Sequence, residues 1–155
     1  MALSSNALCA KAKAMYGYRI GEEGYSDLCR KQSLSEMVTY LKSQTKYSGV
    51  LEDINVRNVH RRQVEAALNK EYFERCARLM KYAPKKNQDF YSQEVIGIEV
   101  QLIVDKVVSI KEKDQASFSL EIPDYLASKM SFNIYGLINV DNYKDLVTYL
   151  RDTRY

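Results

Sequence analysis

Residues 58–82 read NVHRRQVEAALNKEYFERCARLMKY, and this stretch decides the fold. It contains no glycine and no proline. Its apolar residues recur every three or four positions, at Val64, Leu68, Tyr72, Cys76 and Leu79. This spacing places them on one face of an α-helix. The sequence therefore predicts one long amphipathic helix, and Pro84 ends it.

A second long helix is predicted over residues 87–113. One apolar stripe has heptad spacing, at Ile96, Val100, Ile103, Val107 and Ile110, and a second follows Tyr91, Val95, Ile98 and Leu102. Nine of the sixteen residues 95–110 are β-branched, which is typical of strands. The heptad regularity and the length favour a helix. Because two of its sides are apolar, we expect this helix to be buried between neighbours.

Shorter helices are predicted around these two. Ser33 followed by Glu36 is a capping box, which opens a helix ending near Ser43. The other short helices are expected over 5–19, 25–30 and 124–130, and from a cap at Asn139 or Asp141 to Arg151. Together the segments predict an all-α fold, in which helical units pack as bundles.

The composition is that of a globular protein. The chain has 155 residues, of which 46% are hydrophobic, and 23 Lys and Arg stand against 20 Asp and Glu. The three cysteines, Cys9, Cys29 and Cys76, form no Cys-x-x-Cys pair, so neither a zinc site nor a disulfide framework is indicated. We expect no cofactor and no bound metal. No apolar run is long enough to span a bilayer, so any work at a membrane is expected to be peripheral.

An internal repeat is the most informative feature. Residues 37–47 read MVTYLKSQTKY and residues 146–155 read LVTYLRDTRY, about 108 positions apart. Tyr40, Leu41 and Tyr47 in the first copy correspond to Tyr149, Leu150 and Tyr155 in the second. Because a repeat defines the structural unit, these residues are expected to have structural roles, with tyrosine rings between helices and hydroxyls at the rim.

The repeat also suggests a domain organisation. We expect a first helical unit over residues 1–113, a linker over 114–138, and the start of a second, incomplete unit over 139–155. The chain is then expected to be the front part of a longer protein. Apolar surface near Leu137, Ile138, Leu146 and Leu150 is expected to be uncovered, so we expect the chain to self-associate.

These motifs resemble a known family. The first helix carries Asn6, Ala7, Ala10, Ala14 and Met15. Next come a Ser-Leu-x-Glu-x-x-x-Tyr-Leu helix over residues 33–41, a Thr-x-Tyr turn at residues 45–47, and a pair of long helices. This order is similar to that in the C subunits of V-type and A-type ATP synthases, whose eukaryotic counterparts are the d subunits of V-ATPases.

The resemblance implies a mechanical role. The family is built of three similar helical units arranged as a funnel, which lies on the cytoplasmic face of the membrane. It implies that this chain is a peripheral, non-catalytic subunit that couples the central shaft to the ion-carrying rotor ring. The implied partners are therefore the shaft subunits and the ring, with no nucleic acid and no nucleotide bound.

A basic stretch offers candidate contacts with a partner. Residues 57–86 hold nine Lys and Arg against three Glu. The candidate contact residues are Arg57, Arg61, Arg62, Arg75 and Arg78. The stretch is open to three interpretations: an ordinary solvated helix face, a surface for an acidic protein, or a groove that tracks phosphates. The alternative function is therefore a helical nucleic-acid-binding protein that uses residues 57–86, and a third is a generic helical adaptor.

Catalytic motifs are absent from the sequence. It has no glycine-rich phosphate loop, no Gly-x-Ser-x-Gly and no His-Glu-x-x-His. The sole histidine, His60, stands among arginines and is expected to be a solvated residue at a helix start. Glu22 and Glu23 suit the first turn of a helix, where carboxylates interact favourably with the helix dipole. The sequence therefore indicates a protein that is not an enzyme.

Overall fold

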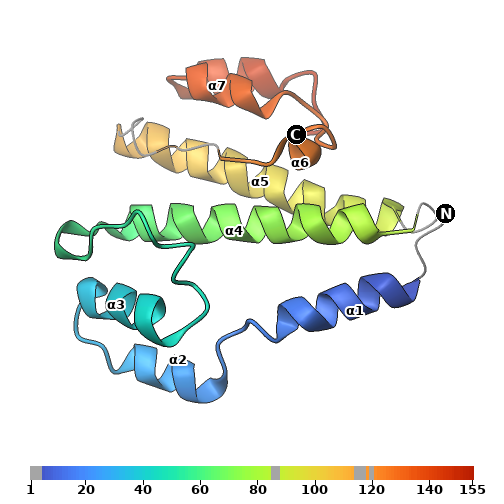
Figure 1. The fold of residues 1–155 in the computed structure, drawn as a ribbon. Helices are drawn as coiled ribbons and strands as arrows, with labels where there is room; N and C mark the ends of the chain where they lie inside the picture. The colour runs from blue at the N-terminus through green and yellow to red at the C-terminus, as the bar shows by residue number, and fades with distance from the viewer. Residues whose placement is uncertain (1–4, 85–87, 114–117, 119–120) are drawn as a thin grey trace. The chain divides into compact units, whose positions relative to one another are not determined.

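The fold was obtained as a computed structural model, which describes residues 5–84, 88–113, 118 and 121–155. All regular structure in these residues is helical, as the sequence predicts. The elements are α1 (Ser5–Tyr16), α2 (Glu22–Cys29), α3 (Leu34–Gln44), η1 (Val56–Asn58), α4 (Arg61–Tyr82), α5 (Gln88–Glu112), α6 (Asp124–Ala127), η4 (Ile134–Asn139) and α7 (Tyr143–Leu150). Figure 1 shows their order along the chain.

Two compact units make up the chain, one ending at Arg75 and the other running from Cys76 to Tyr155. The boundary falls within the long helix α4. The sequence repeat predicts a different division, with units over 1–113 and 139–155 and a linker between them. That division is based on sequence similarity and stays a prediction. Part of that linker, residues 114–117, 119 and 120, lies outside the described residues.

The core of the first unit joins α3 to the start of α4. Its buried residues are Val38, Leu41, Leu51 and Val64. Around them pack Leu28 from α2, Leu34 from α3 and Leu68 from α4, among others. The Ser33 cap forms as predicted, because the Glu36 amide donates to Ser33 Oγ at 3.2 Å, whereas Glu36 Oε2 accepts at 3.0 Å from the amide of Gln32, one residue before the cap.

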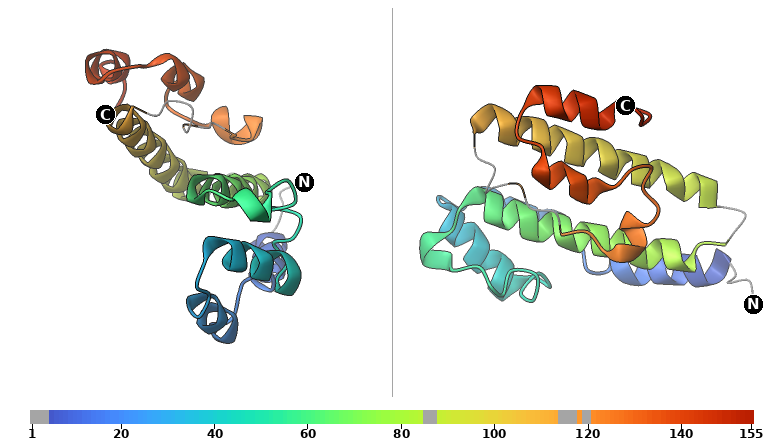
Figure 2. Two further views of the ribbon diagram at one scale, coloured as in Figure 1. Left: turned by 90° about the vertical axis from the view of Figure 1, so that its left-hand side faces the viewer. Right: turned by 90° about the horizontal axis from the view of Figure 1, so that it is seen from above.

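The second unit is built on α5. Figure 2 shows α6, η4 and α7 on one side of this helix. Val95, Ile98 and Leu102 of α5 are buried, and so are Ile122, Leu126, Ile134, Leu137 and Leu146. The sequence did not predict η4, although Asn133 caps it by accepting from the Tyr135 amide at 3.2 Å. The cap of α7 is Asn142 rather than the predicted Asn139 or Asp141.

One expectation about apolar surface is wrong, and a second is wrong in part. The helix over 87–113 is not buried on both sides in the described structure, because Val100, Val104, Val107 and Val108 are exposed. Its buried face is the second apolar stripe. Leu137 and Leu146 are also buried rather than uncovered, since the turns of η4 and α7 direct them inward, whereas Ile138 is half exposed.

Candidate partner-binding surface and repeat motif

The start of α4 brings three of the candidate arginines together. Asn55 caps η1 by accepting from the Arg57 amide at 3.0 Å, so Arg57 lies just ahead of the helix. Arg61 and Arg62 open α4, and all three arginines are exposed. Cations at a helix N-terminus repel the positive end of the helix dipole. Their placement therefore adds no stability to the helix and leaves a basic surface.

Arg61 forms a short ion pair. Its Nε lies 2.7 Å from Glu65 Oε1, one turn along α4. The hydrogen bond to Glu65, followed by the charge of Glu65, raises the pKa of Arg61. Since both side chains face solvent, this pair contributes little to stability. The guanidinium keeps donors that a partner can use.

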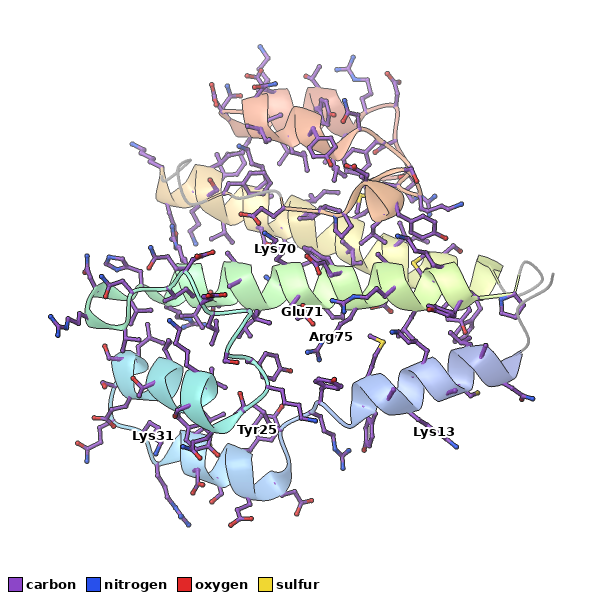
Figure 3. All side chains as sticks on the ribbon, in the orientation of Figure 1. Lys13, Tyr25, Lys31, Lys70, Glu71 and Arg75 are labelled. Carbon is purple, nitrogen blue, oxygen red and sulfur yellow. The ribbon has the colours of Figure 1, made fainter. Side chains whose placement is uncertain are left out.

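Arg75 is held inside the first unit. Its Nε donates to Glu71 Oε1 at 2.6 Å, and its guanidinium lies 5.2 Å from the centre of the Tyr47 ring. Figure 3 shows Glu71 and Arg75 projecting from the same side of α4, with Lys70 on the other. Partial burial acts to lower the pKa of Arg75, but the hydrogen bond to Glu71 and the interaction with Tyr47 outweigh it, so the pKa is raised.

Arg78 is exposed, and it lies beyond the unit boundary together with the last turn of α4. Arg75 and Arg78 are at least thirteen residues beyond Arg62 on α4, or about 20 Å at 1.5 Å per residue. The five arginines therefore do not form one patch along the helix. The structure gathers Arg57, Arg61 and Arg62 and separates the other two from them.

The repeated tyrosines and leucines occupy matched local structures. Leu41 is buried and Leu150 is half-buried. Tyr40 and Tyr149 each lie near a glycine of the preceding helix: a Cβ at Gly24 would come 3.4 Å from the Tyr40 hydroxyl, and a Cβ at Gly136 would overlap the Tyr149 ring. The Tyr149 hydroxyl also donates to the Asn133 carbonyl. The close approach of Tyr149 therefore requires a glycine at position 136, whereas at Gly24 a Cβ would come closest to the Ile20 side chain, at 2.6 Å.

The two Thr-x-Tyr turns have the same hydrogen bonds. Thr45 Oγ1 donates to the Leu41 carbonyl at 2.5 Å, and Thr153 Oγ1 donates to the Leu150 carbonyl at 2.7 Å. The same oxygens accept from the amides of Tyr47 and Tyr155, both at 3.2 Å. The similarity of 37–47 to 146–155 is therefore a structural repeat and not only a match of letters.

One buried cluster was missed at the sequence level. Glu99 of α5 is 1% exposed, and its carboxylate accepts from the Ser131 amide, from Ser131 Oγ at 3.1 Å and from the Tyr155 hydroxyl at 2.6 Å. Burial, followed by the hydrogen bond to Glu99, raises the pKa of Tyr155 to about 12. The signal available was the position of Glu99 one turn after Val95 and one turn before Leu102, on the apolar stripe, because a glutamate is seldom buried without partners.

Neither a metal cluster nor a membrane span appears in the described residues. No three His, Cys, Asp or Glu side chains among them lie close enough to hold a metal ion. None of the described helices has the length and hydropathy needed to cross a bilayer. His60 is exposed, and its backbone amide donates to Gln63 Oε1 at 3.1 Å, which places it at the start of α4 as expected.

The fold and these surfaces define a helical protein with an internal repeat and a basic surface at the start of its long central helix. A family model, the ATP synthase (C/AC39) subunit, matches residues 8–155. The chain therefore belongs to the C/AC39 family of ATP synthase subunits, in agreement with the resemblance seen in its motifs. The searches against curated proteins and against solved structures gave no match.

Proposed function

We propose that this chain is a non-catalytic subunit of a rotary V/A-type ATPase and couples the rotating shaft to the ion-carrying ring at the cytoplasmic face of the membrane. The family match over nearly the whole chain carries the proposal. The repeated turn and the close packing of Tyr149 on Gly136 support it, since a subunit that transmits torque needs helices held rigidly by buried contacts. The family match gives no support to the nucleic-acid alternative.

The proposed contact with a partner protein lies at the start of α4. Arg57, Arg61 and Arg62 are exposed there, whereas Arg75 is partly buried against Glu71 and Tyr47. Arginines on a rim steer an acidic partner and hold it with charge-assisted hydrogen bonds. Arg75 then stabilises the fold of the first unit, and Arg57, Arg61 and Arg62 contact the partner.

The test is a tagged pull-down from detergent-solubilised membranes of the source cell, eluted with a salt gradient. Shaft or ring subunits of the ATPase should be recovered with the full chain. Arg57→Ala combined with Arg62→Ala should release them at lower salt. The matched control, Lys144→Ala combined with Arg151→Ala, removes two exposed cations in and just after α7 and should elute like the unaltered chain. Recovery of RNA or DNA without these subunits would contradict the proposal.

A further inference from the structure

A second surface of the first unit combines tyrosine rings with cations. Arg19 lies over the Tyr16 ring, with its guanidinium carbon 3.8 Å from the ring centre. Lys46 lies over the Tyr18 ring at 4.2 Å. All four side chains are exposed, with Tyr16 62% and Tyr18 49% accessible. We call these four residues the tyrosine–cation surface.

This surface joins segments that are distant in sequence. Tyr16 ends α1, and Tyr18 and Arg19 follow it, where the Arg19 amide donates to the Tyr16 carbonyl at 3.1 Å. Lys46 comes from the Thr-x-Tyr turn after α3. The same turn places Tyr47 under Arg75. The first Thr-x-Tyr turn therefore places Lys46 over one aromatic ring, and the ring of its Tyr47 lies under Arg75.

The cations of this surface have no carboxylate partner among the described residues. Neither Arg19 nor Lys46 forms an ion pair there, in contrast to Arg75, whose charge Glu71 balances. Residues 1–21 contain Lys11, Lys13 and Arg19 and no acidic residue, and residues 37–51 contain Lys42 and Lys46 and no acidic residue. The acidic residues nearest to Arg19 in sequence are Glu22 and Glu23, which are exposed on the first turn of α2, and those nearest to Lys46 are Glu52 and Asp53, which are also exposed.

Stacking on a ring prepares these cations for binding. A guanidinium that lies over a ring keeps N–H donors at its edge, which suit bidentate contact with a carboxylate, and a lysine ammonium adds a point charge. Because the ring already restricts the side chain, less entropy is lost when a partner binds. Tyrosine and arginine are also the residue types that dominate binding energy at protein interfaces.

We propose that the tyrosine–cation surface binds an acidic segment of a partner protein. A protein is favoured over a nucleic acid because one face of each ring already carries a cation, whereas single-stranded nucleic acids stack bases on free ring faces. A chain that belongs to a family of subunits of a multisubunit ATP synthase works among other proteins. The surface is distinct from the arginines at the start of α4.

Fluorescence anisotropy with a labelled peptide of alternating glutamate and alanine tests the proposal on the full chain. The peptide should bind, and the same peptide with glutamine in place of glutamate should not. Arg19→Gln combined with Lys46→Gln should weaken binding at least tenfold. The control, Lys144→Gln combined with Arg151→Gln, removes equal charge from an exposed site in and just after α7 and should weaken it less than threefold.

A second pair of variants separates this surface from a general effect of charge. Tyr16→Leu combined with Tyr18→Leu keeps every charge but removes both rings, and it should weaken binding about threefold or more because the cations lose their supports. Equal weakening by the two charge-removing pairs would overturn the proposal. So would tighter binding of a single-stranded oligonucleotide, or of vesicles containing phosphatidylserine, that depends on Arg19 and Lys46 more than peptide binding does.

Discussion

The hydroxyl of Tyr155 donates a 2.6 Å hydrogen bond to the buried carboxylate of Glu99, fifty-six residues earlier in the chain. The bond fastens the second Thr-x-Tyr turn to the middle of α5. Ser131 supplies the other two donors to the same carboxylate. A buried carboxylate is tolerated only when hydrogen-bonded, so these contacts explain why a glutamate stands on the buried face of α5.

Tyr155→Phe should therefore destabilise the second unit. The substitution removes one of three donors to a buried charge, and such a hydrogen bond is worth about 1–2 kcal/mol. Hydrogen exchange of α5 amides would measure the loss as faster opening. Tyr143→Phe is the matched control, because Tyr143 is about as exposed as Tyr155 (49% against 41%) but its hydroxyl is not among the donors to Glu99, and it should change stability by less than about 0.5 kcal/mol. Equal protection of α5 in both variants would show that the bond to Glu99 is not stabilising.

Two glycines should respond to alanine in opposite directions. A Cβ at Gly136 would overlap Tyr149 and force it away from the Asn133 carbonyl, so Gly136→Ala should lower the free energy of unfolding by about 1–3 kcal/mol. Gly97 lies inside α5 with open space around it, so Gly97→Ala should raise the free energy of unfolding by about 0.5–1 kcal/mol. Urea denaturation followed by circular dichroism would measure both. A loss of stability in both variants would contradict this account.

Equivalent positions of the repeat should differ in sensitivity. Val38 is completely buried in the core of the first unit, whereas its counterpart Val147 is 67% exposed on α7. Val38→Ala should lower the free energy of unfolding by about 2 kcal/mol, because it opens a cavity beside Leu51 and Val64. Val147→Ala should change it by less than about 0.5 kcal/mol. Thermal unfolding of the two variants compares them directly, and similar shifts would mean that Val147 is also covered in solution.

Lys106 should make stability depend on pH. It is 1% exposed, with its Nζ 3.4 Å from the Ile138 carbonyl and 4.8 Å from the Phe118 ring centre. Burial lowers the pKa of Lys106, although the charge of Asp141 opposes this effect. Between that lowered pKa and the ordinary value of 10.5, the unfolded chain binds more protons than the folded one. The free energy of unfolding should therefore rise with pH through this interval.

Lys106→Met tests this pH effect. The variant keeps a long side chain but has no charge to desolvate, so it should be more stable than the unaltered chain at pH 7, by about 1 kcal/mol. Its stability should also be less dependent on pH up to 10. Urea denaturation at pH 7, 8, 9 and 10 gives both results. An identical pH slope in the two proteins would assign the dependence to other groups.

The sequence predicted the helices well because their signals are local. The spacing in residues 58–82 and the Ser33 cap depend on neighbours three or four residues away, and α4 and α3 formed where expected. The repeat was also readable, since its turn hydrogen bonds involve residues at most four apart.

Contacts across long sequence distances were not predictable in this way. Nothing local indicates that Tyr155 reaches Glu99 or that Lys46 lies over Tyr18. The basic stretch shows the same limit. The sequence offered no reason to distinguish its arginines. In the structure, however, Arg75 contacts Glu71 and Tyr47, whereas Arg57 is exposed. The charged residues of a helix can be counted from the sequence, but whether each one can contact a partner depends on the side chains that pack beside it.

The coupling role is tested most directly by measuring ATP hydrolysis and ion pumping together in membrane vesicles from source cells that carry either the unaltered protein or the Arg57→Ala and Arg62→Ala variant. The account predicts that ATP hydrolysis persists in the variant while the number of ions pumped per ATP falls, because the head still turns over but transmits less torque to the ring. An unchanged ratio of ions to ATP, with the variant protein present at its normal level, would contradict it.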